Sequence, residues 1–376
     1  MRKVLAILLT AVMTAALSGC NTHPELNELA IAEAIGIDKA EDGYTVTMQY
    51  FNTDTTGGTT AIDSSQPNAV TVSGTGETIE SAIQALSYNC GKSVMLGSAG
   101  LIIFGRDAAY DILDKLSFAM SHYSGNPRAF IAVSETSASD ILNVKFSEGN
   151  ASVEKLEAML RNAQRLGLGK PSVGHEAAEL LSCPTGSVAL TMLKASESGS
   201  ELTEKGNTVI ITGGAVCTDG SFADKLTPEQ MSGLGMLTEN GSKCEMTVIF
   251  RGKDISVMIY GTKTKIVPTL ADETLTFDIE MSGECKIVSS QLSDPYSDRN
   301  AIEHLAEEEI KRRVSSMLAD SATALGADIA AFAYKIRAHS PDLWRTVSAD
   351  YRSALRSAKF NISCEFRMER FGITHG

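Results

Sequence analysis

The 376-residue sequence is poor in the residue patterns that most enzymes and nucleic-acid-binding proteins need. Its six histidines are scattered, and its seven cysteines contain no Cys-x-x-Cys pair, so the usual spacing of a zinc site is missing. No Gly-x-Ser-x-Gly motif is present, so a hydrolase of that type lacks its most visible signature. With 46 acidic and only 33 basic residues, the formal net charge of −13 argues against binding to a phosphate backbone and hence to nucleic acid.

Candidate cofactor and acid/base residues are equally scarce. Gly74-Thr75-Gly76 lies between a predicted strand and a predicted helix, as in a dinucleotide-binding fingerprint, but Ile79 occupies the position of the third small residue. A turn into an amphipathic helix explains this stretch better. Carboxylates are numerous, but their separation in space is unknown, so no acid/base pair is assigned. The sequence therefore offers no set of catalytic residues, and it predicts no cofactor and no metal.

Long hydrophobic runs are also absent, and the one apolar region of note lies at the start of the chain. It runs from Val4 to Leu17 after Met1-Arg2-Lys3, which is too short to span a bilayer and has the layout of a secretory signal. It ends in Leu-Ser-Gly-Cys, which resembles the lipobox of bacterial lipoproteins. In such signals the cysteine is diacylated and becomes the new N-terminus. We expect residues 1–19 to be a lipoprotein signal peptide and Cys20 to be the lipidation site.

Lipidation of Cys20 would tether the protein to a membrane surface outside the cytoplasm. Each buried methylene contributes roughly 0.8 kcal/mol, so two acyl chains hold a protein stably whereas one does not. Removal of Arg2 and Lys3 with the signal changes the formal charge from −13 to −15. Anionic headgroups do not attract such a chain, so the lipid itself must provide the attachment.

Apolar periodicity predicts an α+β fold with mixed, mainly antiparallel sheets and packed helices in two or three domains. Residues 25–51 are typical of a β-hairpin around the Asp-Gly dipeptide at 42–43. Further strands are expected at 69–73, 99–104, 128–133, 209–211, 246–250, 255–260, 275–281 and 362–369. Helices are expected at 77–88, 108–118, 152–166 and 298–318, and on both sides of Pro341. The polar stretch 194–207 is predicted to be a linker that ends an N-terminal α/β domain over 20–198.

Charge and cysteine patterns in this fold have simple interpretations. The helix over 298–318 carries the i,i+4 pairs Glu307–Lys311, Glu308–Arg312 and Glu309–Arg313, for which a solvated helix face is a sufficient explanation. Six cysteines remain besides Cys20. They are widely spaced in a chain that is large enough to build a core. Isolated thiols are therefore favoured over disulfides.

Four stretches, taken together and in order, resemble the Ger(x)C family, the lipoprotein C subunits of spore germinant receptors. The first follows Cys20 and is ELNELAIAEAIGIDKAEDGYTV, and the second is AGLIIFGRDAAYDILDKL. The third is GGAVCTDGSFADKLTPEQMSGLGML and the fourth is LGADIAAFAYKIRAHSPDLW. The matching positions are Glu25, Leu26, Leu29, Ala30, Gly36, Ile37, Asp38, Lys39, Gly214, Ala215, Val216, Asp219, Leu226, Glu229, Gly326, Asp328, Pro341 and Trp344.

The resemblance implies a non-enzymatic subunit, anchored by lipid on the outer face of the spore inner membrane. It would act with integral-membrane A and B subunits in receptor assembly or signalling during nutrient-triggered germination. The family's three domains also imply that the part after the linker divides again, into a middle β-rich domain over 207–265 and a C-terminal α+β domain over 266–376.

The chain departs from the family at three places. Asn21 replaces the Trp that often follows the lipidated cysteine, and Cys217 replaces a Phe. Residues 330–333, Ala-Ala-Phe-Ala, replace Phe-Gly-Phe-Gly. Because alanine favours helix, we expect the fold to survive this last change.

Two other functions share the anchor. A solute-binding lipoprotein of an import system would have a similar acidic surface, but it often carries ligand-facing aromatic residues, and this chain has one Trp and 6% aromatics. A lipid-anchored hydrolase lacks a recognisable nucleophile or metal set.

Overall fold

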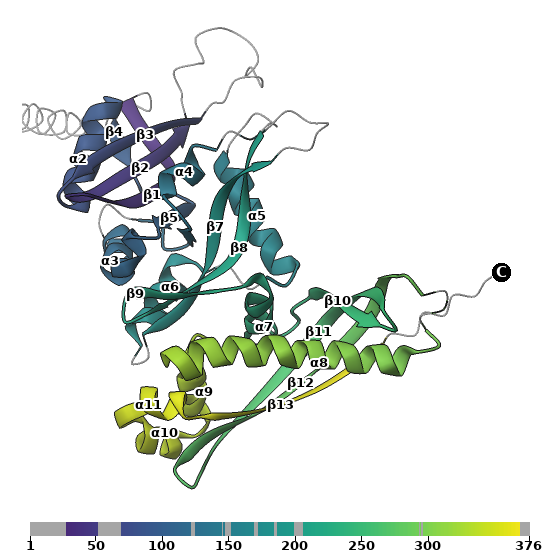
Figure 1. Ribbon diagram of the computed structural model, residues 1–376. Helices are drawn as coiled ribbons and strands as arrows, with labels where there is room; N and C mark the ends of the chain where they lie inside the picture. Colours follow the sequence, from purple (N-terminus) through teal and green to yellow (C-terminus); the bar gives the residue numbers. More distant parts are fainter. Residues whose placement is uncertain are drawn as a thin grey trace, which may run out of the picture.

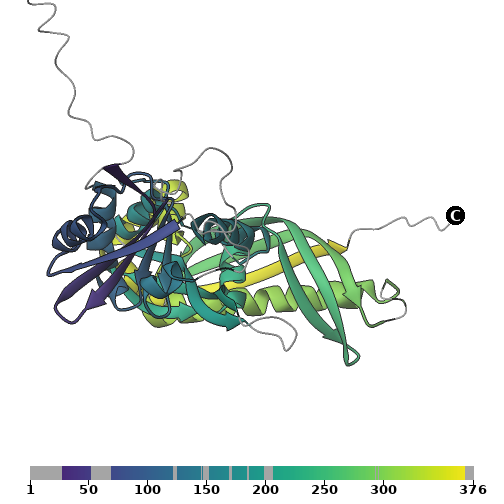
Figure 2. The ribbon, with the colours of Figure 1, turned by 90° about the horizontal axis from the view of Figure 1, so that it is seen from above.

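Two mixed β-sheets with packed helices make up the described part of the chain, which confirms the predicted α+β class. The structure is a computed structural model that describes residues 28–51, 69–121, 125–144, 146, 152–168, 172–183, 186–198, 206–292, 294 and 296–368. In Figure 1 the second sheet and its long helix lie below the first sheet, and in Figure 2 they extend well past it.

The first sheet begins with the predicted hairpin. Strands β1 (Leu29–Ala40) and β2 (Gly43–Phe51) pair in antiparallel fashion around the Asp-Gly turn, and β3 (Ala69–Gly76) pairs with β2. Helix α2 (Ile79–Cys90) starts at a capping box formed by Thr78 and Ser81. The short strand β4 (Ser93–Met95) and strand β5 (Leu101–Gly105) then run parallel to β1.

Both faces of this sheet are covered by helices. Strand β5 is fully buried, and its alternate residues belong to two different hydrophobic clusters. One face carries α2, α3 (Ile112–Ser121) and α6 (Gly174–Ser182), and the other carries α4 (Ala138–Leu142) and α5 (Ser152–Arg165). Strand β6 (Phe130–Ser134) lies between β5 and β7.

Both ends of the stretch predicted to be a linker belong to the strands of a long hairpin. Strands β7 (Ser187–Ser198) and β8 (Gly206–Thr218) pair in antiparallel fashion from Ser187 opposite Thr218 to Ser198 opposite Gly206, and β9 (Ser221–Leu226) pairs with β8. Residues 194–198 and 206–207 are therefore strand residues within one sheet, and the prediction of a linker there was wrong.

The second sheet has the order β10-β11-β12-β13. Its strands are β10 (Cys244–Phe250), β11 (Lys253–Ala271), β12 (Thr274–Ser290) and β13 (Lys359–Met368). The boundary predicted between residues 265 and 266 falls inside β11, which continues without a break across it. The division into three domains stays a prediction, since strand pairing alone groups the described residues into two sheets.

Helices connect and cover the second sheet. Helix α7 (Pro228–Thr238) follows β9, and α8 (Arg299–Leu318) continues into a π-helical turn at Ala319–Leu325. Helices α9 (Phe332–His339), α10 (Pro341–Val347) and α11 (Tyr351–Arg356) then precede β13. One hydrophobic cluster joins residues of β7 to β9 with α7 and the second sheet, so the two sheets share a core at their junction.

The six cysteines in the described part of the chain are free thiols, as predicted. Burial raises the pKa of the Cys217 thiol to about 12, and burial raises the pKa of the Cys285 thiol to about 12 as well. These two residues therefore act as small apolar side chains.

Candidate functional site

The predicted lipidation site, Cys20, lies outside the described residues, so its role stays a prediction. No helix in the described part of the chain is long and apolar enough to cross a membrane. The site that the structure does build is the junction between the two sheets, where helices from both halves of the chain meet.

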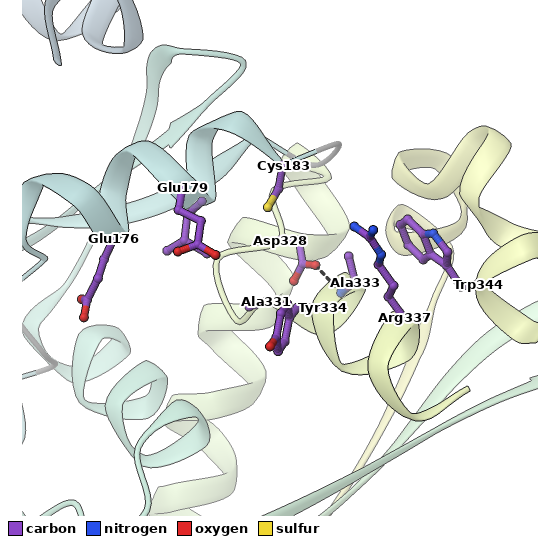
Figure 3. Close-up of a pocket in the computed structure, with 10 residues that line it drawn as sticks. Glu176, Glu179, Cys183, Asp328, Ala331, Ala333, Tyr334, Arg337 and Trp344 are labelled. Carbon is purple, nitrogen blue, oxygen red and sulfur yellow. Dashed lines mark hydrogen bonds between the residues drawn. The ribbon is translucent and has the colours of Figure 1, made fainter. Parts of the chain in front are cut away.

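A pocket of about 310 Å³ opens at this junction, between α6 on one side and α9 and α10 on the other. Figure 3 shows Glu179 and Cys183 on the α6 wall, with Tyr334, Arg337 and Trp344 on the opposite wall. Its lining thus combines apolar surface with charges of both signs. Among the residues that the structure describes, no group of His, Cys, Asp and Glu side chains could hold a metal ion.

A buried carboxylate, Asp328, forms the floor of the pocket and organises the C-terminal helices. It accepts hydrogen bonds from the backbone N–H groups of Phe332 (2.8 Å) and Ala333 (2.7 Å) and from the hydroxyl of Tyr351 (3.1 Å). Burial raises the pKa of Asp328, and the three hydrogen bonds oppose that shift. Burial also raises the pKa of Tyr351 and lowers the pKa of Lys335 nearby. Asp328 therefore fixes the start of α9 and ties it to α11.

The residue before α9, Ala331, has left-handed backbone angles of φ 55° and ψ 39°. This conformation costs an alanine about 1–2 kcal/mol and glycine almost nothing. The helix α9 forms with alanine in this stretch, as expected, and Ala333 lies inside it, but Ala331 precedes the helix and gains nothing from the helix preference of alanine.

We predict that Ala331→Gly stabilises the protein by about 1 kcal/mol, because the strain at this position is relieved. A urea titration followed through Trp344, the single tryptophan, should show a higher midpoint. Ala333→Gly is the matched control and should lower the midpoint, since glycine is unfavourable within a helix. A lower midpoint for Ala331→Gly would contradict the assigned strain.

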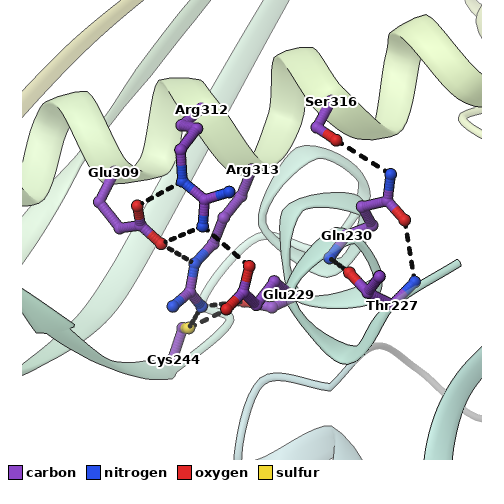
Figure 4. A network of polar contacts seen from close by, with 9 residues as sticks. Thr227, Glu229, Gln230, Cys244, Glu309, Arg312, Arg313 and Ser316 are labelled. Atoms are coloured by element: carbon purple, nitrogen blue, oxygen red, sulfur yellow. Dashed lines mark hydrogen bonds and ion pairs between the residues drawn. The ribbon is translucent and has the colours of Figure 1, made fainter.

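A second polar cluster holds α7 against α8 (Figure 4). Arg313 is buried, and its Nε donates to Glu309 Oε1 at 2.8 Å while its Nη1 lies 3.2 Å from both Ser232 Oγ and Cys244 Sγ. Arg312 bridges Glu309 and Glu229, each at 2.8 Å. The two helices approach closely at Gly233, where a Cβ would lie 2.9 Å from the backbone carbon of Arg313.

The ion pairs predicted along α8 are only partly correct. Glu309–Arg313 exists, but Lys311 pairs with Glu308, and Glu307 accepts the backbone N–H of Phe366 at 2.9 Å. Glu303 likewise accepts the N–H of Met368 at 2.7 Å. The prediction of a solvated face holds for Glu308 and Arg312, which are exposed, but it is wrong for the buried Arg313. Glu303 and Glu307 accept hydrogen bonds from the edge strand β13, which protects that edge from pairing with other strands.

Two family models match the sequence and together cover most of it. The model for the spore germination protein N-terminal domain matches residues 22–195, and the model for the spore germination B3/GerAC-like C-terminal domain matches residues 212–372. The chain belongs to the Ger(x)C family. This membership supports a role in spore germination. The first match ends within β7 and the second begins within β8.

The structural comparison agrees with this family. The crystal structure of the GerBC protein matches with a TM-score of 0.57 at 17% sequence identity, covering 92% of this chain and 100% of that chain. At this identity the match establishes the fold alone. The search of curated proteins found no match.

Several positions of the Ger(x)C resemblance have structural roles in this chain. Asp38 accepts the backbone N–H groups of Ala138 (2.6 Å) and Ser139 (3.0 Å) and so fixes α4 to β1. Gly214 leaves room for Met231, whose Sδ would lie 2.2 Å from a Cβ there. These residues serve the packing of helices on the first sheet.

Other motif positions lie at the junction of the two sheets. Asp219 forms an ion pair with Arg352 of α11, and Glu229 pairs with Arg312 of α8. Hydrogen bonding to Arg352 lowers the pKa of Asp219. Asp328 and Trp344 line the pocket.

The sequence singled out these residues as family positions, but it did not indicate that they meet. Arg313 was missed as a junction residue because only the packing of α7 reveals its burial.

Proposed function

We propose that this Ger(x)C chain is the lipid-anchored, non-enzymatic subunit of a spore germinant receptor. It would be held on the outer face of the spore inner membrane beside integral-membrane A and B subunits, and it would act in assembly or signalling of the receptor. One observation carries the proposal: a lipobox-like sequence ends at Cys20, and the first germination-family model begins at residue 22. Signal and family domains thus follow each other directly.

The chemistry of the junction supports a structural rather than a catalytic role. The carboxylate of Asp328 accepts three hydrogen bonds from the protein itself, and the buried guanidinium of Arg313 is held by Glu309, Ser232 and Cys244. Groups engaged in this way fix the relative position of helices. A solute-binding lipoprotein of an import system is less well supported, because both matching family models describe spore germination.

The lipid anchor is tested by Cys20→Ala in the full-length protein. Because two acyl chains provide many buried methylenes, we expect the variant to move almost completely from the membrane fraction to the soluble fraction of spores. Cys90→Ala, which alters a free, partly exposed thiol, should stay with the membrane. A Cys20→Ala protein that remains membrane-bound would reject lipid attachment at this residue.

A further inference from the structure

One end of the first sheet lies next to the point where the described chain begins. Strand β1 starts at Leu29, which lies beside Ser93 of β4, and Ile31 lies beside Met95. Tyr88, in the last turn of α2, lines one groove together with Ser93 and Val94. We call this surface, made of the last turn of α2, the turn at Gly91 and β4, the α2–β4 end. In Figure 1 it lies on the side of the molecule away from the second sheet.

Large apolar side chains are exposed at the α2–β4 end. Tyr88 is 75% exposed and Met95 is 44% exposed, whereas Val94 is partly buried against the core of the first sheet. The hydroxyl of Tyr88 accepts a hydrogen bond from Gln84 Nε2 at 3.0 Å. A tyrosine with a solvated hydroxyl and an apolar ring suits the boundary between lipid headgroups and acyl chains.

Acidic residues are sparse at this surface, although Glu80 also lines the groove. The chain has 46 Asp and Glu in all, yet none occurs from Ser81 to Arg106. Anionic headgroups repel carboxylates, so a surface that lies against them benefits from this gap. The α2–β4 end is therefore suited to a lipid surface, although the chain as a whole is strongly acidic.

The length of the chain between Cys20 and β1 also favours this end of the sheet as the one that faces the membrane. Leu29 is the ninth residue after Cys20, so the start of β1 can lie no more than about 30 Å from the lipidated residue. Strand β1 has 12 residues and so leads about 40 Å away from that point. The far end of the sheet, where Tyr110 follows β5, lies about 40 Å from the start of β1, which is more than this segment can reach.

We propose that the α2–β4 end rests on the bilayer surface, with Tyr88 and Met95 in the interfacial layer. This inference rests on the proposed lipid anchor. It gives the tethered protein a fixed orientation, in which the second sheet points away from the lipid and is presented to neighbouring proteins.

Tryptophan quenching tests this orientation. Tyr88→Trp and, as the matched control, Tyr110→Trp are prepared in a Trp344→Phe background as full-length, lipidated proteins. Tyr110 suits the control because it is 51% exposed and lies at the opposite end of the sheet. The proteins are reconstituted into vesicles of phosphatidylglycerol and phosphatidylcholine, with or without dibrominated phosphatidylcholine, which quenches tryptophan only on contact.

We expect the Tyr88→Trp protein to lose emission in the brominated vesicles and its emission maximum to move to shorter wavelength, while the Tyr110→Trp protein keeps its emission. An anchored Tyr88→Trp protein that is not quenched, or equal quenching of the two variants, would overturn the orientation and leave the anchor intact. A protein that does not migrate with the vesicles in a flotation gradient would overturn the lipid anchor at Cys20, and with it the proposed orientation.

Discussion

Asp328→Ala is expected to lower the free energy of unfolding of the second sheet and its helices by about 3–5 kcal/mol. The change removes the acceptor for two backbone N–H groups and the Tyr351 hydroxyl, all within the core. Each buried donor left without a partner costs about 1–3 kcal/mol, and relaxation of the start of α9 recovers part of that sum. At a urea dependence of about 1–3 kcal/mol per molar, the midpoint should fall by more than about 1 M.

Trp344 is well placed to measure this effect, because its ring lies 5.3 Å from that of Tyr351. Asp342→Ala, in the neighbouring helix α10, removes a carboxylate that is 91% exposed and should leave the midpoint nearly unchanged. Asp328→Asn should remain strongly destabilising. Each carboxylate oxygen of Asp328 now accepts one backbone N–H, and the NH₂ group of asparagine would face one of these two donors. A midpoint for Asp328→Ala within error of the control would contradict the structural role of this residue.

Glu309→Ala is expected to destabilise the protein by about 3 kcal/mol, because it leaves the buried guanidinium of Arg313 without its carboxylate. The same urea titration measures the loss. Burial raises the pKa of Glu309, but hydrogen bonds from Arg312 and Arg313 outweigh burial and bring the net pKa below its ordinary value. The contribution of this residue is therefore present above the unfolded pKa and is lost as the pH falls through the folded one.

Two variants separate this effect from a general loss of charge on α8. Glu308→Ala removes the neighbouring carboxylate, which pairs with Lys311 on the surface, and should not shift the midpoint. The double change of Glu309→Leu with Arg313→Met replaces the buried pair by apolar side chains and should recover most of the stability. Equal destabilisation by Glu308→Ala and Glu309→Ala would contradict the burial of the Arg313 pair.

Local patterns in the sequence predicted much of the fold. The hairpin of β1 and β2, the helices α2 and α8, and the final strand β13 all lie within a few residues of their predicted bounds. In α2, α8 and β13 the spacing of apolar residues reports which face meets the core, whereas β1 is buried on both faces and the Asp-Gly turn after it marked the hairpin.

Helix α7 was not predicted because it has no polar face. Its residues from Gln230 to Leu237 are all buried, and Gly233 and Gly235 argue against a helix by propensity. The remaining signal was local: Thr227 and Gln230 form a capping box, and Pro228 stands in the first turn.

The junction between the sheets depends on tertiary contacts that no sequence period encodes. Arg313 resembles any other member of a charged helix face until Ser232 of α7 and Cys244 of β10 pack against it. Asp328 and Trp344 were singled out by family resemblance alone, and the opposite wall of their pocket comes from α6, about 150 residues earlier in the chain. The prediction of lipidation at Cys20, in contrast, rests only on neighbouring residues in the sequence: a charged start, an apolar run and the small residues directly before the cysteine.

The central claim, that this Ger(x)C protein is one subunit of a membrane receptor, is tested most directly by purifying the tagged, full-length protein from spore membranes in mild detergent and identifying its partners by mass spectrometry. We expect recovery of two multi-spanning proteins, the A and B subunits. Their loss is expected for Cys20→Ala but not for Cys90→Ala. Recovery of a transport permease, or of the protein with no multi-spanning partner, would contradict the account.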